Sequence, residues 1–257
     1  MMKMNLASVS LKVDTMVLTT NPMALLNDPM GQAIIDYAQN KATEDITVLS
    51  DICDDDHIPV SYLFREYDEM PEMEKQALNE CKGRVLDIGA AAGMHAQFLI
   101  EKGHVVNTID RSENAIRHLK AKGVPAEHVD FFDYKGTDYD TLLLLMNGIG
   151  IAKNLDNLKH TLSKAKSMLR KNGKILCDSS DIKYLYQDDE GGMWVDLNTS
   201  YYGNFKFKMK YKEHESEWFE WLYVDFEKLR EIAEDVGFKV RKITEIDNQY
   251  LAELTQI

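Results

Sequence analysis

The residues best placed to do chemistry lie in the segment 84–95, RVLDIGAAAGMH. Its apolar run 85–88 predicts a buried strand, a turn of small residues follows, and a helix opens at Gly93. This order of strand, glycine turn and helix N-terminus is typical of a cradle for a nucleotide-like ligand. Asp87 lies near the end of the strand, where its charge would repel a pyrophosphate. The segment is therefore predicted to suit a ligand that carries hydroxyls or a cationic amine.

An acidic residue at the end of the next predicted strand extends this motif. Asp110 follows Gly89 by 21 residues, a spacing that places a carboxylate where it can accept hydrogen bonds from a ribose diol. The alternative is an acid at a helix N-terminus, stabilised by the helix dipole. Gly89 allows the tight turn, whereas the methyl group of Ala91 limits how closely a ligand approaches the backbone. We favour ribose binding for Asp110.

The pattern 85–93 together with Asp110 resembles the signature of class I S-adenosylmethionine (SAM)-dependent methyltransferases. Blocks at 130–132, 142–147 and 169–174 agree with it. The likeness is close over residues 83–183 and looser over 225–256. Two departures are mild: Ala91 replaces the commoner middle glycine, and Asn172-Gly173 replaces the usual Pro-Gly. The resemblance implies an α/β fold with a Rossmann-like, mostly parallel sheet of seven strands and helices on both faces.

The resemblance also implies roles for single residues. Asp87 and Gly89 would face the methionine amine of SAM, and Gly93 would let its helix pack close to the strand. Asp110 would hold the ribose hydroxyls. The other implied contacts lie at the adenine and the reactive sulfonium. The full set of implied cofactor-binding residues is Asp87, Gly89, Ala91, Gly93, Asp110, Arg111, Asp130, Phe131, Met146 and Asn147.

Methyl transfer asks little of the protein's side chains, because the cofactor carries the electrophile. A general base is optional and depends on the acceptor. Candidates are His95, in the first turn of the helix after the glycine loop, and Asp178 and Asp181, which follow the fifth strand. A packing histidine and capping aspartates are the competing interpretations. The Asn-Pro-Pro-Tyr motif of enzymes that methylate nucleic-acid amino groups is replaced here by NGIG at 147–150, which disfavours adenine or a glutamine amide as acceptor.

Elements outside the methyltransferase-like core are predicted to recognise the acceptor. Residues 1–27 are expected to form an extension without fixed structure, 28–82 a helical cap, and 83–257 the methyltransferase domain. The alternation of aromatic residues and lysines over 205–212 predicts an antiparallel strand, part of an inserted hairpin at about 194–224. Strands are also expected at 129–132, 141–146 and 174–177. The candidate acceptor-binding residues are Tyr62, Arg65, Trp194, Tyr201 and Tyr202.

Composition narrows the class of partner. The net charge of −13 disfavours nucleic acid, since phosphate binding needs a basic face. Three cysteines without a CxxC pair indicate reduced thiols and a cytoplasmic protein. No apolar run approaches the roughly 20 residues of a membrane helix. The run of acids at 54–56 is interpreted as a solvated loop, and no metal is expected.

These observations predict a SAM-dependent methyltransferase that acts on a small molecule. An NAD(P)-dependent oxidoreductase is one alternative, although two of the three fingerprint glycines are missing and Asp87 would crowd the pyrophosphate. The other is a non-catalytic SAM-binding protein that keeps the pocket and lacks acceptor chemistry.

Overall fold

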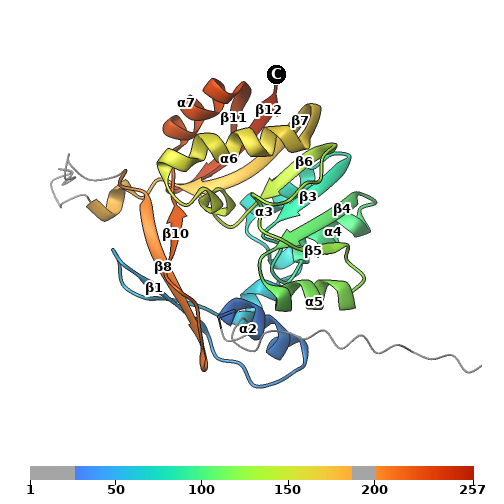
Figure 1. Ribbon diagram of the computed structural model, residues 1–257, viewed down its shortest axis with the longest axis vertical. Coiled ribbons are helices and arrows are strands. Elements are labelled where there is room, and N and C mark those ends of the chain that lie inside the picture. Colours follow the sequence, from blue (N-terminus) through green and yellow to red (C-terminus); the bar gives the residue numbers. More distant parts are fainter. Residues whose placement is uncertain (1–26, 187–200) are drawn as a thin grey trace, which may run out of the picture.

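The structure, a computed structural model, describes residues 27–186 and 201–257. Two sheets organise these residues (Figure 1). The larger, here called the central sheet, has seven strands flanked by helices. The smaller, here called the side sheet, has five strands and stands beside it, joined by helix α2 (Pro29–Ala38). The predicted extension 1–27 lies almost wholly outside the described residues, as does Trp194.

The central sheet has the strand order β11-β12-β7-β6-β3-β4-β5. The five strands from β5 to β7 are parallel, and β12 is antiparallel to both of its neighbours. The middle of the sheet is buried on both faces and holds apolar runs such as 142–144 of β6 and 175–177 of β7, as expected where helices cover both faces. The predicted Rossmann-like sheet with an antiparallel last strand is confirmed. The strands are β3 (Arg84–Ile88), β4 (Val105–Asp110), β5 (Ala126–His128), β6 (Tyr139–Leu144), β7 (Leu169–Ser180), β11 (Phe238–Ile246) and β12 (Gln249–Gln256).

Helices cover both faces of the central sheet. Leu162 and Leu229 belong to one buried cluster, so α6 (Leu155–Met168) and α7 (Phe226–Val236) share a face. The other face is covered by α3 (Glu72–Glu80), α4 (Met94–Glu101) and α5 (Glu113–Ala121), through a cluster that includes Leu78, Leu99 and Leu119. Burial of these side chains is the main source of stability, at about 25 cal/mol for each Å² of apolar surface.

The side sheet corrects the interpretation of residues 28–82 as a wholly helical cap. This region does hold helices, but it also holds two strands, of which β1 pairs with β8 of the predicted hairpin and β2 pairs with β1, in the order β10-β8-β1-β2 with β9 beside β8. The hairpin itself is confirmed, with Phe207 opposite Phe219. The local pattern missed the pairing because β1 meets its partner far along the chain. The strands are β1 (Ile46–Ser50), β2 (Asp56–Ile58), β8 (Asn204–Tyr211), β9 (His214–Glu215) and β10 (Phe219–Leu222).

Several element boundaries also differ from the sequence prediction. The third parallel strand ends at His128, so the expected strand at 129–132 is a turn in which Asp130 Oδ1 accepts the Phe132 N–H. The strand predicted at 174–177 begins at Leu169. Four short 3-10 helices complete the described chain: η1 (Val60–Phe64), η2 (Tyr67–Glu69), η3 (Gly148–Ala152) and η4 (Lys183–Tyr186).

Helix caps fix where α2 meets the rest of the molecule. Asp28 Oδ1 accepts the Gly31 N–H and caps α2, while Ser112 Oγ accepts the Ala115 N–H and caps α5. The two caps are joined, because Ser112 Oγ donates to Asp28 Oδ2 at 2.7 Å. Among the described residues, no helix is both long and apolar enough to span a bilayer.

Candidate functional site

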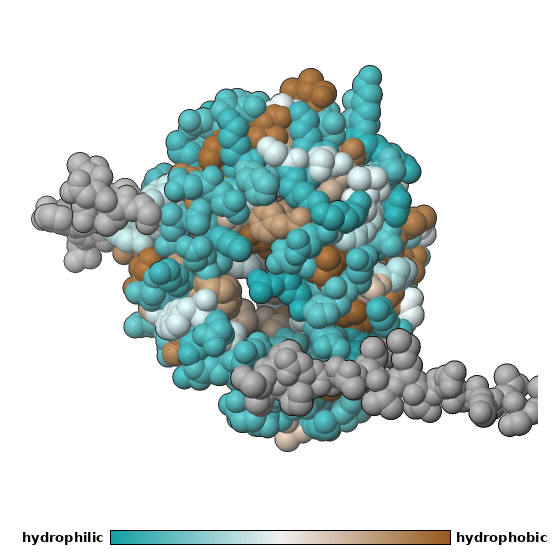
Figure 2. All heavy atoms as spheres, in the orientation of Figure 1, coloured by the Kyte–Doolittle hydropathy of each residue, from teal (hydrophilic) through white to brown (hydrophobic). Residues whose placement is uncertain are grey.

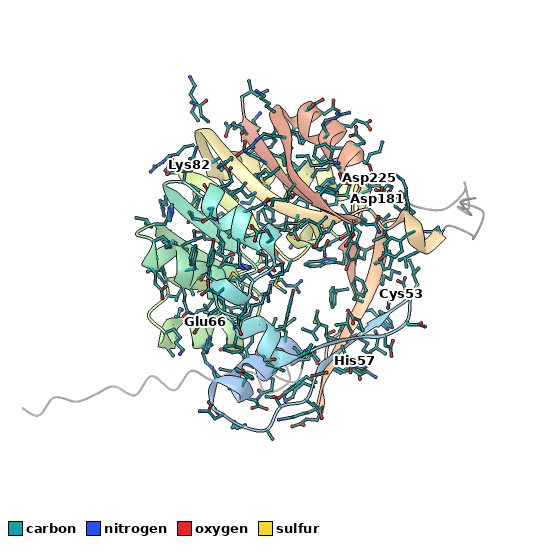
Figure 3. All side chains as sticks on the ribbon, turned by 180° about the vertical axis from the view of Figure 1, so that it is seen from behind. Cys53, His57, Glu66, Lys82, Asp181 and Asp225 are labelled. Carbon is teal, nitrogen blue, oxygen red and sulfur yellow. The ribbon has the colours of Figure 1, made fainter. Side chains whose placement is uncertain are left out.

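A cavity of about 580 Å³ lies between the carboxyl edge of the central sheet and the inner face of the side sheet. Figure 2 shows the surface hollowed between these parts, and Figure 3 shows Cys53 and His57 on the side-sheet border of this opening. Its lining includes the whole of the glycine loop 87–95, the segment 145–148 after β6, and alternate residues of the side sheet. The size is that of a pocket for one or two small molecules.

The glycine loop has the strained backbone that its sequence predicts. Gly89 and Gly93 adopt φ values of +75° and +82°, and Ala91 also has a positive φ of +47°. Ala91 is held there because its N–H donates to Asp110 Oδ2 at 2.9 Å. A Cβ on Gly93 would lie 2.1 Å from a methyl carbon of Leu119. The close approach that Gly93 permits is therefore to helix α5, rather than to the strand as predicted.

Asp87 is a buried carboxylate aimed at this cavity. Its side chain is 3% exposed, it lines the cavity, and its Oδ2 has no hydrogen-bond partner among the described residues. Burial raises the pKa of Asp87 to about 6, and the charge of His95 opposes the rise. A buried carboxylate oxygen without a donor is costly, so the site favours a ligand that brings a cationic donor.

The residues predicted for the adenosyl end lie behind the glycine loop and are not part of the cavity lining. Asp110 Oδ1 accepts the Ser112 N–H, so each oxygen of Asp110 has one backbone donor and keeps a free lone pair. Burial raises the pKa of Asp110. Arg111 is exposed and pairs with Asp130 at 3.5 Å, whereas Phe131 is a core side chain.

A buried ionic group, which we call the Arg65–Glu74–His95 triad, forms part of the cavity wall. Glu74 binds the Arg65 guanidinium with one oxygen and His95 Nε2 with the other, at 2.7 Å for His95. Burial alone would raise the pKa of Glu74, but hydrogen bonds and charges from His95 and Arg65 hold it below its usual value. Arg65 Nε is buried without a partner in the described chain. Tyr62 lies outside the lining and stacks on Arg65, with its ring 3.7 Å from the guanidinium carbon.

Glu74 was missed by the sequence analysis, although a signal was present. It falls on the apolar face of α3, at helical spacing from Ala77, Leu78 and Cys81. A charged residue on such a face is seldom buried without a partner. That exception could have marked Glu74 as part of a site.

The turn after β6 presents Met146 and Asn147 to the cavity. Both have positive φ values, +62° and +55°, which L-residues seldom adopt. Asp178 holds this turn, because its two oxygens lie 3.0 and 3.1 Å from the Asn147 nitrogen. Burial raises the pKa of Asp178 to about 6. Asp178 does not line the cavity, so its contacts support a role in positioning the turn over the predicted role as a base.

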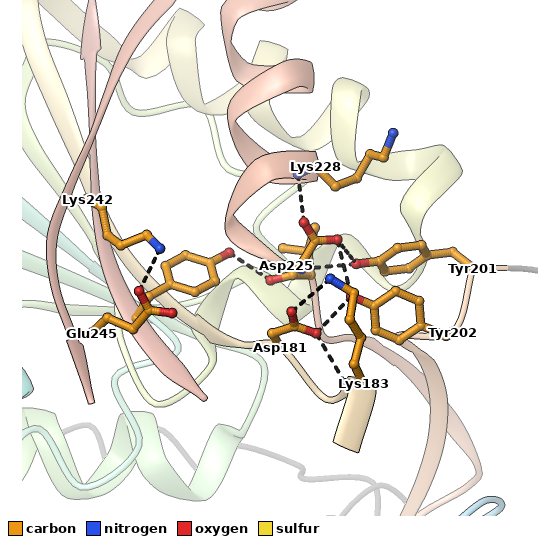
Figure 4. A network of polar contacts seen from close by, with 10 residues as sticks. Asp181, Lys183, Tyr201, Tyr202, Asp225, Lys228, Lys242 and Glu245 are labelled. Carbon is orange, nitrogen blue, oxygen red and sulfur yellow. Dashed lines mark hydrogen bonds and ion pairs between the residues drawn. The ribbon is translucent and has the colours of Figure 1, made fainter. Parts of the chain in front are cut away.

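Asp181, Tyr201 and Tyr202 belong to a polar network away from the cavity lining (Figure 4). Tyr202 Oη donates to Asp181 at 2.9 Å, and Tyr201 Oη donates to Asp225 at 2.6 Å. Asp225 also caps α7 by accepting the Lys228 N–H. These contacts anchor the chain after η4 to α7. Asp181, Tyr201 and Tyr202 do not line the cavity.

The cavity wall opposite the glycine loop is aromatic, whereas the sequence pattern predicted only an antiparallel hairpin there. The side chains of β8 and β10 that line it belong to one face of the side sheet, and they also pack on one another with ring centroids 5.6–6.4 Å apart. Gly150 of η3 lies against this wall, since a Cβ there would be 2.1 Å from Trp221. The aromatic lining residues of the two strands are Phe205, Phe207, Phe219 and Trp221.

The acidic segment is a loop up to Asp55, as predicted, but Asp56 belongs to strand β2, and both Asp54 and Asp56 line the cavity. Asp51 to Asp55 are exposed, and no group of three or more potential ligand residues in the described chain could hold a metal ion.

A protein-family model and several solved structures are similar to this chain. The family model described as a methyltransferase domain matches residues 60–243. The chain belongs to the methyltransferase family. A SAM-dependent methyltransferase from Bacteroides fragilis, solved in complex with S-adenosylhomocysteine (SAH), is 40% identical with a TM-score of 0.85, over 91% of this chain and 97% of that one. A comparison with curated proteins finds no match.

More distant structures share the fold of this methyltransferase. The CcbJ methyltransferase of Streptomyces caelestis is 14% identical with a TM-score of 0.57, over 74% of this chain and 95% of that one. A SAM-dependent methyltransferase of Clostridium acetobutylicum is 12% identical with a TM-score of 0.54, over 75% and 92%. The predicted class I SAM-dependent methyltransferase, with SAM as its cofactor, is confirmed, and nothing favours the oxidoreductase or the non-catalytic protein.

Proposed function

We propose that this methyltransferase transfers the methyl group of SAM to a small molecule that binds against the side sheet. The observation that carries the proposal is the shared cavity: one space is lined both by the glycine loop and by the inner face of the side sheet. Methyl transfer requires donor and acceptor to meet with water excluded, and a single cavity of about 580 Å³ provides such a place.

Asp87 is proposed to hold the amine of the methionine moiety. Its buried Oδ2 lacks a donor, and an ammonium group would supply one and favour the ionised carboxylate. Arg65 offers a matching cationic donor for the carboxylate of the same moiety, because its buried Nε is also unpartnered and it lines the same cavity. The residues present therefore fit the amino-acid end of SAM.

The remaining cofactor contacts are proposed from the family resemblance. Asp110 keeps one lone pair on each oxygen for the ribose hydroxyls, and the Ala91 hydrogen bond fixes it against the glycine loop. Asp130 and Phe131 would flank the adenine. Met146 and Asn147 would lie beside the sulfonium, where SAM supplies a methyl group that is already activated for attack.

His95 is the better placed of the predicted bases. It lines the cavity, and Glu74 fixes its ring by binding Nε2, which leaves Nδ1 to face a ligand or solvent. A histidine oriented by a carboxylate can take a proton from an acceptor. Asp178 and Asp181 lack such access in the described chain.

The expected partner class and location are part of the same proposal. An excess of acidic over basic residues, 43 to 30, opposes binding to a polyanion such as nucleic acid. The three cysteines are free thiols, with Cys53 exposed, which suits the reducing cytoplasm.

Two measurements test the proposal. SAH binding, measured by isothermal titration, should weaken at least about tenfold in Asp110→Ala, since charged hydrogen bonds contribute roughly 1.5–3 kcal/mol each. Asp133→Ala, at an exposed aspartate in the turn after β5, is the matched control. Unchanged affinity in Asp110→Ala would count against the ribose assignment.

Cell extract incubated with methyl-labelled SAM and the protein should yield labelled small molecules in mass spectrometry. Label found only in protein or nucleic acid would contradict a small-molecule acceptor. Slow hydrolysis of SAM as the sole turnover would indicate a non-catalytic binding protein.

A further inference from the structure

The inner face of the side sheet differs in chemistry from its outer face. Strand β8 directs Phe205, Phe207 and Met209 into the cavity, whereas the alternating lysines do not line it. Two of these lysines, Lys208 and Lys210, pair with Glu215. The strand thus keeps its cations out of the cavity and lines it with ring faces and a thioether.

Two acidic residues of the cavity lining, Asp54 and Asp56, lie on the side-sheet side of the cavity. Asp56 of β2 lines the cavity, and it pairs in register with Val48 of β1, which also lines it. The residue of β2 that alternates with Asp56 is His57, which is not part of the lining and contacts Thr47. Asp56 Oδ1 accepts the backbone N–H of His57 at 2.8 Å, and Asp56 Oδ2 has no hydrogen bond within the described chain. Asp54, in the preceding loop, lines the cavity as well.

The net charge of the lining favours a cation. Its one guanidinium, that of Arg65, is neutralised by Glu74, and His95 is bound to the same carboxylate. Because Asp87 is assigned to the cofactor amine, what remains for the acceptor is the carboxylates of Asp54 and Asp56 together with aromatic rings. Ring faces attract cations, and a carboxylate beside them adds to that attraction while repelling anions.

We propose that the methyl acceptor is an amine with an apolar or aromatic body, whose ammonium form binds between Asp56 and the aromatic wall. This rests on the proposed function and names its substrate class. The charged nitrogen is held at the exposed carboxylate of Asp56, and the apolar body extends over Val48 and Met209, which lie beside Asp56 in the strand register, toward Phe207. Anionic acceptors are excluded by the same charges.

The transfer step balances for such an acceptor. The ammonium group first gives one proton to His95, the proposed base, which lines the same cavity and is oriented by Glu74. The nitrogen lone pair then forms the bond to the methyl carbon, the carbon–sulfur bond breaks, and its electron pair stays on sulfur. The positive charge passes from sulfur to nitrogen, so the products are the methylated ammonium and SAH with a neutral thioether sulfur, and no further oxidant, reductant or metal is needed.

The test uses the full chain saturated with SAH and three probes of one shape: phenethylamine, 2-phenylethanol and phenylacetate. Isothermal titration at pH 7.5 and low salt should show phenethylamine binding about tenfold tighter than the alcohol, with phenylacetate weakest. Equal or tighter binding of the alcohol or the carboxylate, or no amine binding in the millimolar range, overturns the proposal.

Matched variants locate the effect. Asp56→Asn should weaken phenethylamine binding about five- to tenfold and leave the alcohol unchanged, whereas Asp55→Asn, an exposed neighbour outside the lining, should change neither. Phe207→Leu should weaken the amine more than the alcohol. Equal results for the two aspartate variants overturn the proposal.

SAH affinity, measured first in every protein, distinguishes a failure of the proposed function from a failure of the amine assignment alone. If the wild type does not bind SAH, the proposed function fails and this inference fails with it. If all variants bind SAH normally but show no preference for the amine, only the inference fails.

Discussion

The central sheet and the side sheet line the same cavity but are built in different ways. In the central sheet, β3, β4 and β5 are successive in the chain and each pairs with the next. In the side sheet, β1 pairs with β8 from the opposite end of the chain, Val48 facing Met209. The cofactor end of the cavity therefore forms from segments that are close in the chain, whereas the acceptor end forms only when distant strands pair.

The junction between the two parts is polar and buried. The Arg65–Glu74–His95 triad ties the segment before α3 to the glycine loop, and α2 joins α5 to β8 through Ser112 on one side and Tyr211 on the other. If the two sheets form one cooperative unit, breaking these contacts should destabilise both together.

The largest expected effect is at Glu74. Glu74→Gln removes the charge that compensates Arg65 in a buried site, and we expect it to destabilise the fold by about 3–5 kcal/mol in urea unfolding. Glu72→Gln, at an exposed glutamate of the same helix, is the control and should stay within about 0.5 kcal/mol of wild type. Adding Arg65→Met to Glu74→Gln should restore part of the loss. Equal stability of the two single variants would show that the junction is not held by this charge.

A second effect, of about 1–3 kcal/mol, is expected at Asp87 and depends on pH. Its pKa is about 6 in the folded protein against 3.8 as the reference value. The folded state therefore binds more protons than the unfolded state in this range, so stability without ligand falls as pH rises from about 4 to about 7. Asp87→Asn should flatten part of that fall, the remainder belonging to Asp178, and should exceed wild type in stability at pH 8.

The same variant should behave in the opposite way toward the cofactor. Asp87→Asn should weaken SAH binding about 100-fold, because a charged contact to the amine is lost. Asp138→Asn, at an exposed aspartate, is the control for both measurements. Parallel stability–pH profiles for wild type and Asp87→Asn, or undiminished SAH affinity, would contradict this account of the buried carboxylate.

The smallest effect is expected at Asp28, which caps α2 and accepts from Ser112 of α5. Asp28→Ala should cost about 1 kcal/mol, the usual value of an N-cap. Unfolding should remain a single transition by circular dichroism and tryptophan fluorescence, because α2 bridges the two sheets. Asp45→Ala provides an exposed control. Two separate transitions would mean that the sheets fold independently.

The contrast between the sheets also explains which features the sequence could predict. The glycine loop and the strand before it depend on neighbouring residues, so local patterns sufficed to predict them. Strand β1 was missed because its partner lies far along the chain. Phe207 was predicted only as part of an alternating strand, since alternation shows that a residue shares a face but not what that face meets.

For the candidate bases, too, the sequence pattern predicted the position in the chain but not the direction of the side chain. Asp178 and Asp181 follow β7 at the carboxyl edge, as the motif predicts, but their direction is set by contacts from Asn147 and Tyr202. Glu74 comes from a helix that the cofactor motif does not include. Whether a polar side chain faces the cavity depends on tertiary packing in each of these cases.

A structure of the protein in complex with SAH tests the central claim most directly. The account predicts SAH in the cavity along the glycine loop, with its amine within hydrogen-bond distance of Asp87 Oδ2 and its thioether facing the side sheet. SAH bound elsewhere, or a glycine loop filled by the protein's own side chains in that complex, would contradict it.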